Sequence, residues 1–495
     1  MSNQVIISLD SGTTSCRALA IDQKGTLLGV SQKEFTQIFP SSGWVEHNPK
    51  EIWDTQLKVL KELIAKLSID LDQIIGLGIT NQRETTVVWD KSTGEPVYNA
   101  IVWQDRRTAD ICEKMKADGL AGYVSSNTGL VIDAYFSGTK IKWILDRDPK
   151  IRKSANDGQL LFGTIDTWLI WNLSKGDSHA TDHTNASRTL LYNLNTNDWD
   201  SKMMDYLEVP KSMLPTIKNS ADHYGFWEYK GVKVPILGVA GDQQSALFGQ
   251  ACFNSGESKN TYGTGCFMLM HTGHQPSFSK SGLLTTMAID AEGKPAYALE
   301  GSIFIAGAAI QWLRDGLKII DNSEETEQMA IDVEGENSVV VVPAFAGLGT
   351  PYWDMYARGA IFGLTRDSSE KHLAKATLQS LAFQTKDVLE AMEKDAGIEL
   401  KTLKVDGGAS RNNYLMQFQS DMLNVPVERP SNVETTAMGA AYLVGIQAGI
   451  WKSSSISSHR EVDQLFEPEI DVETRDALYK NWQKAIERSK GWLSD

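Results

Sequence analysis

Short runs of apolar residues alternate with glycine-containing turns along much of the chain, and this pattern predicts buried strands. Residues 5–10 (VIISLD) form the first such run. RALAID followed by KGTLLGVS indicates a hairpin around Lys24 and Gly25. The runs IIGLGIT, TTVVWD and YNAIVWQD follow before residue 106 and are separated by turns. We therefore expect several sheet strands in the first part of the chain.

A second kind of pattern, with apolar residues three or four positions apart, predicts helices. One helix is expected to begin at Asn48 and Pro49, because asparagine suits the N-cap and proline suits the first turn. A long helix is expected from Ser368 or Ser369. Residues 435–449 (TTAMGAAYLVGIQAG) predict a helix of small residues that packs closely against its neighbour.

The second half of the chain shows the same alternation of predicted strands, glycine turns and helices as the first. NTYGTGCFMLMH predicts a strand pair, GSIFIAGAAIQWLRDGL a strand leading into a helix, and VVVVPAF and VPVERP further strands. KVPILGVAGDQQSALFGQA and TLKVDGGASRNNYLMQFQSDML each predict a strand, a glycine turn and a helix. Strands that alternate with helices in this way indicate an α/β protein.

A Gly-Thr dipeptide stands at a predicted turn between two strands in each half. The two glycines, Gly12 and Gly263, lie 251 positions apart in a chain of 495 residues. This spacing predicts a duplicated fold whose two turns face each other across a cleft. We expect the boundary near Phe248, which gives domains of residues 1–248 and 249–495.

Size, charge and cysteine content exclude several classes of protein. A chain of 54.7 kDa is too long for one core, so two large domains are expected. A net charge of −15 without a basic stretch argues against nucleic-acid binding. We find no uncharged apolar run of about 18 residues and no secretory signal in MSNQVIISLD, so neither a membrane span nor secretion is expected. Four cysteines without metal-ligand spacing predict buried free thiols in a reducing cytoplasm: Cys16, Cys112, Cys252 and Cys266.

Candidate chemistry begins at the first Gly-Thr turn, residues 10–15 (DSGTTS). An aspartate that ends a buried strand is poorly solvated unless a cation such as Mg²⁺ lies nearby, which makes Asp10 a candidate. The amides and hydroxyls of the turn, together with Arg17, suit phosphate oxygens. A plain hairpin in which Asp10 bonds its own backbone explains the motif equally well.

Asp242 is the second candidate, because it follows the small residues Gly238 to Gly241 at a predicted strand end. A carboxylate in this place can accept the proton of an attacking hydroxyl. The alternative is that Asp242 caps the following helix. Phosphoryl transfer needs carboxylates near the phosphates and little other covalent chemistry, so Asp10 and Asp242 together are more informative than either alone.

Three further groups of residues are candidates for ligand contact. Gly407 and Gly408 allow a flat ligand close to the backbone, with Asn412 free to bond its polar edge, although a tight connection is the preferred interpretation of Gly-Gly alone. Gly307 and Gln311 lie four apart, on one face of a predicted helix, and a helix that packs its small-residue face explains this spacing at least as well as ligand contact. Arg83, Glu84, Trp103, Tyr135 and Phe267 could hold a small polyol, with the arginine donating and the carboxylate accepting hydrogen bonds. From spacing alone, a salt bridge and core aromatic residues are the simpler interpretation of this last group.

Taken together, several segments resemble the FGGY family of carbohydrate kinases, within the actin-like ATPase superfamily. YFSGTKIKW and the stretch GAIFGLTRDSSEKHLAKATLQ resemble the two signatures of that family. Over essentially the whole chain, SLDSGTTSCRA, GWVEHNP, GITNQRETTVVWD, AIVWQDRRT, AGDQQSALFGQ, NTYGTGCFML and VDGGASRNNYLMQFQSDML are similar to segments of its members. NQRETT with AGDQQ favours glycerol as the substrate over a pentulose, gluconate or erythritol.

The resemblance implies a fold and a set of site residues. It implies two RNase H-like domains flanking a deep cleft, with glycerol and the phosphate turn on the first and ATP on the second. It also implies a homodimer or homotetramer, Asp242 as general base, and Mg²⁺ near Asp10 and Asp242. The residues implied to bind or line glycerol are Arg83, Glu84, Trp103, Tyr135, Asp242, Gln243 and Phe267. The residues implied to contact ATP are Thr13, Thr14, Ser15, Arg17, Thr264, Gly307, Gln311, Gly408 and Asn412.

One segment departs from the family pattern. Some bacterial relatives carry a phosphorylatable histidine in a Tyr-His-Phe-Tyr-Gly segment, where this chain has Glu228 in WEYKG. His223 is close but lies outside that pattern. We therefore do not expect activation by phosphotransfer at this position, and the loop that binds fructose bisphosphate in some relatives is not recognisable.

The expected reaction is ATP + glycerol → ADP + glycerol 3-phosphate, by in-line attack of a terminal hydroxyl. The nearest alternative is another kinase of the same family that acts on a pentulose or a tetritol. A different class would be an ATPase module that switches a protein partner, in which NQRETT and AIVWQD would have no purpose. A catalytically silent scaffold is a third alternative, which the presence of both Asp10 and Asp242 disfavours.

Overall fold

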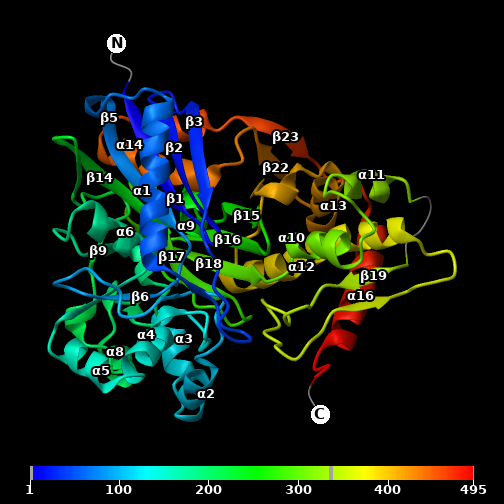
Figure 1. The fold of residues 1–495 in the computed structure, drawn as a ribbon. Coiled ribbons are helices and arrows are strands. Elements are labelled where there is room, and N and C mark those ends of the chain that lie inside the picture. Colours follow the sequence, from blue (N-terminus) through cyan, green and yellow to red (C-terminus); the bar gives the residue numbers. More distant parts are fainter. Residues whose placement is uncertain (1–3, 334–337, 494–495) are drawn as a thin grey trace.

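The computed structural model describes residues 4–333 and 338–493 and contains two large mixed sheets, one in each half of the chain (Figure 1). The strand orders are β13-β14-β5-β1-β2-β3 and β17-β18-β16-β15-β21-β22-β23. The predicted α/β class is thereby confirmed. The predicted domain limits at residues 1 and 495 lie outside the described residues, and the boundary near Phe248 stays a prediction.

Helices cover both faces of the first sheet. In β1, Ile7 and Leu9 pack into the same core as α1 (Pro49–Lys66), whereas Ile6 packs with α14 (Thr435–Gln447) from the other half. Since successive side chains of a strand point to opposite faces, α1 and α14 lie on opposite sides. The other strands are β2 (Ser15–Asp22), β3 (Leu27–Glu34), β5 (Ile74–Asn81), β13 (Phe226–Tyr229) and β14 (Val232–Gly241).

The second sheet repeats the pairing of the first. β1 pairs antiparallel with β2 and parallel with β5, and β15 pairs antiparallel with β16 and parallel with β21. The two Gly-Thr turns therefore occupy the same place in each sheet, and the predicted duplication is confirmed. The strands are β15 (Ser258–Tyr262), β16 (Cys266–Gly273), β17 (Leu284–Ile289), β18 (Pro295–Ile303), β21 (Leu403–Asp406), β22 (Val427–Pro430) and β23 (Val462–Phe466).

The remaining helices and several short strands lie around the two sheets (Figure 1). In the first half they are β4 (Glu46–His47), β6 (Val87–Asp90), β7 (Ala100–Ile101), α2 (Ala109–Ala117), α3 (Ala121–Thr128), α4 (Ser137–Asp146), α5 (Pro149–Asn156), β8 (Leu160–Gly163), α6 (Ile165–Leu173), β9 (Ala180–Asp182), α7 (His183–Ala186), β10 (Tyr192–Asn193), β11 (Asp198–Trp199), α8 (Ser201–Leu207), β12 (Thr216–Lys218) and α9 (Asp242–Gly249). In the second half they are α10 (Gly307–Gln311), α11 (Glu325–Ile331), β19 (Val340–Val342), β20 (Ala360–Phe362), α12 (Glu370–Ala396), α13 (Asn413–Leu423), α15 (Ser453–His459) and α16 (Val472–Ser489).

Two predicted strands lie outside the large sheet. β6 pairs with β8 and β7 with β4, each in a sheet of two strands. The chain leaves the sheet after β5, where Glu84 adopts a left-handed conformation with φ 59°. The glycine turn predicted before α9 is also absent, because β14 ends at Gly241 and the helix begins at the next residue.

The two halves meet at a close contact between α9 and α14. A Cβ added at Gly439 would lie 1.9 Å from the Ser245 carbonyl oxygen, and one added at Gly249 would lie 2.0 Å from that of Thr435. Only glycine permits this approach of two helix backbones. The expectation that the small residues of α14 allow close packing is confirmed.

Other local expectations also agree with the structure. The Asn48 side chain accepts a hydrogen bond from the Lys50 amide at the start of α1, and Ser369 precedes α12. All four cysteines are buried free thiols. Within residues 4–333 and 338–493, no helix combines the length and apolar character needed to cross a membrane.

Candidate active site

Two cavities meet at the second Gly-Thr turn, where Gly263 and Thr264 line both. The larger one, of about 560 Å³, is lined by both halves of the chain, and we call it the interlobe cavity. The smaller one, of about 460 Å³, is lined by the second half, and we call it the side cavity. A ligand in one cavity can therefore contact a ligand in the other beside this turn.

The interlobe cavity brings together most of the residues expected at the polyol and the phosphates. Those that line it are Thr13, Arg83, Glu84, Trp103, Tyr135, Asp242, Gln243, Thr264 and Phe267. The first and second Gly-Thr turns thus border the same cavity, as their spacing predicts. Four other predicted residues lie on or beside the first turn but line neither cavity: Asp10, Thr14, Ser15 and Arg17.

Asp242 is the acid that β14 and α9 present to the interlobe cavity. It is the first residue of α9, and Gly241 rather than Asp242 holds the N-cap position. Its side chain is 30% exposed, with Oδ1 3.3 Å from Arg83 Nε. Desolvation raises the pKa of Asp242 to about 6, although the nearby Arg83 lowers it. Such a carboxyl can exchange a proton near neutral pH, which suits a general base.

Glu84 stands beside Arg83 on the segment that leaves β5. Its left-handed backbone is uncommon for a residue other than glycine, and such strain is concentrated at functional sites. The conformation is held because the Glu84 carbonyl oxygen accepts hydrogen bonds from Thr86 Oγ1 at 3.0 Å and Ser137 Oγ at 2.8 Å. The buried carboxylate accepts a bond from Arg188 Nε at 2.6 Å.

Three aromatic rings line one side of the interlobe cavity. The Trp103 ring packs edge-on against Tyr135 at 5.6 Å and Phe267 at 6.3 Å between centroids. Trp103 Nε1 also donates to Thr13 Oγ1 at 3.1 Å, which links this wall to the first Gly-Thr turn. The rings can cover the carbon side of a small polyol while the charged residues face its hydroxyls.

At the first turn, Asp10 is paired with Arg17 rather than with its own backbone. Arg17 Nε and Nη2 both donate to Asp10 Oδ2, and Arg17 Nη1 donates to Glu434 of the second half. A Mg²⁺ ion that accompanies phosphates needs only one or two carboxylates and keeps several waters. Among the described residues there is no group of three side chains that could hold a metal ion. A Mg²⁺ ion near Asp10 and Asp242 stays a prediction, and such an ion would have to be bound chiefly through phosphates and water.

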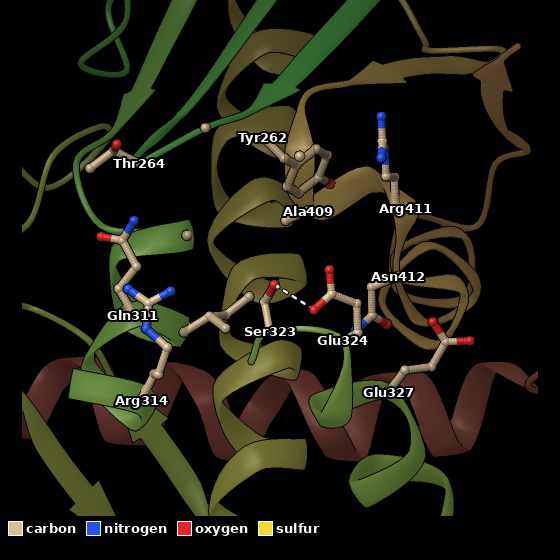
Figure 2. Close-up of a pocket in the computed structure, with 14 residues that line it drawn as sticks. Tyr262, Thr264, Gln311, Arg314, Ser323, Glu324, Glu327, Ala409, Arg411 and Asn412 are labelled. Atoms are coloured by element: carbon tan, nitrogen blue, oxygen red, sulfur yellow. Dashed lines mark hydrogen bonds between the residues drawn. The ribbon is translucent and has the colours of Figure 1, made fainter. Parts of the chain in front are cut away.

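Figure 2 shows the side cavity between the chain after β15 and the loop after β21. Gln311 and Arg314 lie on one side of it, and Arg411 and Asn412 on the other. The remaining lining residues are Tyr262, Gly263, Thr264, Gly307, Ile310, Ser323, Glu324, Glu327, Gly408 and Ala409. The predicted residues Gly307, Gln311, Gly408 and Asn412 are thus brought together here.

The Gly-Gly pair at this cavity has two different roles. Gly407 has φ 88°, and a Cβ there would lie 2.4 Å from the Tyr262 carbonyl oxygen. A Cβ at Gly408 would meet no atom within 4 Å, so this residue leaves open space for a ligand. Asn412 is less free than expected, because its Oδ1 accepts from the Leu415 amide and its Nδ2 donates to Thr326.

Three charged residues next to the interlobe cavity were not predicted from the sequence: Lys259, Arg188 and Glu300. Lys259 is fully buried, and its ammonium donates to Gln243 Oε1, to Thr261 Oγ1 at 2.8 Å and to the Phe267 carbonyl oxygen at 3.2 Å. Glu300 forms an ion pair with Arg83, and Arg188 forms ion pairs with both Glu84 and Glu300. Lys259 and Glu300 could have been found as charged residues within the strands SKNTY and PAYALEGSI. A charged residue in a buried strand indicates a partner elsewhere in the fold.

Comparisons with known proteins show the family of the chain. The model of the N-terminal domain of the FGGY family of carbohydrate kinases matches residues 5–249, and that of the C-terminal domain matches residues 258–448. The chain is 59% identical over 491 residues to a glycerol kinase of Alkaliphilus oremlandii, covering 98% of this chain and 97% of that protein.

Solved structures give the same picture. A Plasmodium falciparum glycerol kinase with ADP superimposes with a TM-score of 0.92 at 38% identity, covering 98% of each chain. A gluconate kinase from Lactobacillus acidophilus superimposes with a TM-score of 0.89 at 22% identity, covering 100% of each chain. At that identity the second likeness shows the fold alone.

Proposed function

Because the chain belongs to the FGGY family of carbohydrate kinases, we propose that it transfers the terminal phosphoryl group of ATP to glycerol, giving ADP and sn-glycerol 3-phosphate. The observation that supports this most is the junction of two cavities at Gly263 and Thr264, with Asp242 on the wall of the larger one. Glycerol would occupy the interlobe cavity, and the nucleoside of ATP the side cavity. The relatives named above include glycerol kinases at high identity.

In this proposal Asp242 accepts the proton of the terminal hydroxyl as the oxygen attacks the γ-phosphorus in line. Arg83 can only donate hydrogen bonds, whereas ionised Glu84 and Asp242 can only accept them, so the three fix the directions of the hydroxyls. Tyr135 and Gln243 complete the polar contacts, and the aromatic wall excludes water from the carbon chain. These roles are supported by the common cavity that the five residues line.

The phosphates would lie between the two Gly-Thr turns. Thr13 and Thr264 border the interlobe cavity, and their hydroxyls and neighbouring amides can stabilise negative charge on transferring oxygens. Thr14, Ser15 and Arg17 would act from the first turn, with Arg17 released from Asp10 and Glu434. Mg²⁺ bound near Asp10 and Asp242 would neutralise charge on the phosphates.

A test of this proposal is ADP release with glycerol and with a panel of ketoses and tetritols. We expect glycerol to give the highest kcat/KM. A clear preference for a pentulose or erythritol would assign the chain to another branch of the family. ATP turnover that is independent of every polyol would instead favour a nucleotide switch that acts on a protein partner.

The protonation of Asp242 should determine the acid side of the pH profile. A general base must be ionised, and a pKa of about 6 lies well above the usual value of 3.8 for an aspartate. The kcat/KM for glycerol should therefore be highest above neutral pH and fall about tenfold for each pH unit below about 6. Initial rates across this range, at saturating ATP, provide the measurement. An acid limb centred near the ordinary aspartate value would contradict the assignment.

The open space at Gly408 gives a second prediction. Gly408→Val should raise the Kd for ADP by about 10-fold, because an added Cβ meets no protein atom and the new side chain would take up space that lines the side cavity. The matched control is Gly122→Val on α3, where an added Cβ also meets nothing within 4 Å but no cavity is involved. Calorimetric titration of ADP measures both. Unchanged affinity in the Gly408 variant would remove the nucleoside from this cavity.

The setting of the enzyme is part of the same proposal. Four buried free thiols support a reducing, cytoplasmic environment. A homodimer or homotetramer, as in members of the family, stays a prediction that sedimentation would test. Glu228 lies on β13 where some relatives carry a histidine, so phosphotransfer at this position is not expected.

A further inference from the structure

The Arg83 guanidinium has two faces with different partners. Its shortest hydrogen bonds go to Glu300, from Nη1 to Oε2 at 2.5 Å and from Nη2 to Oε1 at 3.0 Å, and Nη1 also donates to Gln244 Oε1 at 3.2 Å. Its longer contacts face the cavity, from Nη2 to the Tyr135 hydroxyl at 3.4 Å and from Nε to Asp242 Oδ1 at 3.3 Å. Long contacts are weak, so the donors on the cavity side can turn to a ligand hydroxyl.

Glu300 provides this anchoring from the opposite half of the chain. It lies on β18 in the second sheet, and its side chain is completely buried. Burial alone would raise the pKa of Glu300, but Arg188 and Arg83 outweigh it and lower that pKa to about 2. The carboxylate is therefore ionised, and its bidentate pairing fixes both the position and the plane of the guanidinium.

Arg188 extends the network to Glu84. Its Nε donates to Glu84 Oε1 at 2.6 Å and its Nη2 to Glu300 Oε1 at 3.0 Å. Its Nη1 is buried without a hydrogen-bond partner among the described residues, and the guanidinium carbon lies 5.6 and 5.4 Å from the ring centroids of Tyr135 and Phe136. Contact with these rings compensates part of the missing bond.

We infer that Glu300 and Arg188 are positioning residues for acceptor recognition. They fix the side chains of Arg83 and Glu84 through ion pairs, although neither Glu300 nor Arg188 lines the interlobe cavity. This inference rests on the proposed function. Positive and negative groups alternate through the network, from Glu84 to Arg188, Glu300 and Arg83. Glu300 belongs to the second sheet and Arg83 to the first half of the chain. The Arg83 side chain is therefore held in position for a polyol only when the two halves are packed together.

The direct test is Glu300→Gln, which keeps the size of the side chain and removes its charge. Arg83 should then turn toward Asp242 and Glu84, the carboxylates already within 3.3 and 3.8 Å of its Nε. We expect the KM for glycerol to rise about 10- to 100-fold, the range for hydrogen bonds to charged groups, and the Kd for ADP to change less than about twofold. Glycerol binding is measured independently of turnover by the fluorescence of Trp103 and the other tryptophans.

The matched control is Glu46→Gln. Glu46 is also buried and accepts bonds from Tyr98, Asn99 and Arg107, none of which lines either cavity. It should lower thermal stability without changing the KM for glycerol. A Glu300→Gln enzyme whose glycerol KM stays within about twofold of the wild type, or moves in step with the Kd for ADP, overturns the inference.

The inference can still be tested if the Glu300→Gln variant does not fold. If Glu300→Gln shows no cooperative melting, Arg188→Lys must raise the KM for glycerol while leaving the Kd for ADP nearly unchanged. Lysine keeps the charge but cannot bond Glu84 and Glu300 in the planar geometry of arginine. Failure of that variant to raise the glycerol KM also overturns it. If the wild-type enzyme itself shows no polyol-dependent ADP release, it is the proposed function that fails.

Discussion

Replacing Asp242 by asparagine should lower kcat by about 10³-fold while the Kd for ADP changes less than about twofold. Asparagine has the same size and keeps a hydrogen-bonding group, but it cannot accept the proton of the attacking hydroxyl. The side cavity is formed by other residues, so nucleotide binding should persist. Single-turnover and steady-state rates, with calorimetric titration of ADP, provide the measurement.

The matched control is Asp205→Asn, at an exposed position on α8 that lines neither cavity. It should be indistinguishable from the wild type. A kcat close to normal in the Asp242 variant would show that another group, or water alone, takes the proton. Loss of ADP binding in that variant would indicate a structural rather than a chemical role.

The second large effect should be discrimination by hydroxyl groups. We expect kcat/KM for propane-1,2-diol to be about 10⁴-fold below that for glycerol, because its missing hydroxyl leaves buried charged groups without a partner. Arg83 and Glu84 are almost fully buried and cannot recover the lost bond from bulk water. Competition between the two acceptors, with both phosphorylated products quantified, measures the ratio directly.

A ratio below about 100-fold would show that the cavity recognises shape rather than hydroxyls, since a purely apolar pocket reaches about that discrimination. The Glu300→Gln variant offers an internal comparison. With Arg83 no longer anchored, the discrimination should shrink along with the affinity for glycerol.

Much of the fold follows from local sequence. Both strand pairs with a Gly-Thr tip, the helix beginning at Pro49 and the close contact at Gly439 are set by patterns within a few residues. Patterns of this kind determine the type of an element but not its distant partner. The strands around Val87 and Ala100 were expected from their sequence, but nothing in the sequence indicated that they pair with β8 and β4 rather than join the large sheet.

The same distinction separates the site residues that were found from those that were missed. Asp242 and Arg83 stand in AGDQQ and NQRETT, two of the segments that resemble the family. Glu300 and Lys259 acquire their roles from partners elsewhere in the fold, and the partner of Glu300, Arg83, lies 217 positions away. Sequence spacing could not join them, but a charged residue in a buried strand indicates that such a partner exists.

The central claim is that a phosphoryl donor and a three-carbon acceptor meet beside the turn at Gly263 and Thr264. A crystal structure with a non-hydrolysable ATP analogue, Mg²⁺ and glycerol tests it most directly. We predict glycerol between Arg83 and Asp242, with one terminal hydroxyl directed at the γ-phosphorus. Glycerol bound outside the interlobe cavity, or a terminal phosphate remote from Asp242, would contradict the account.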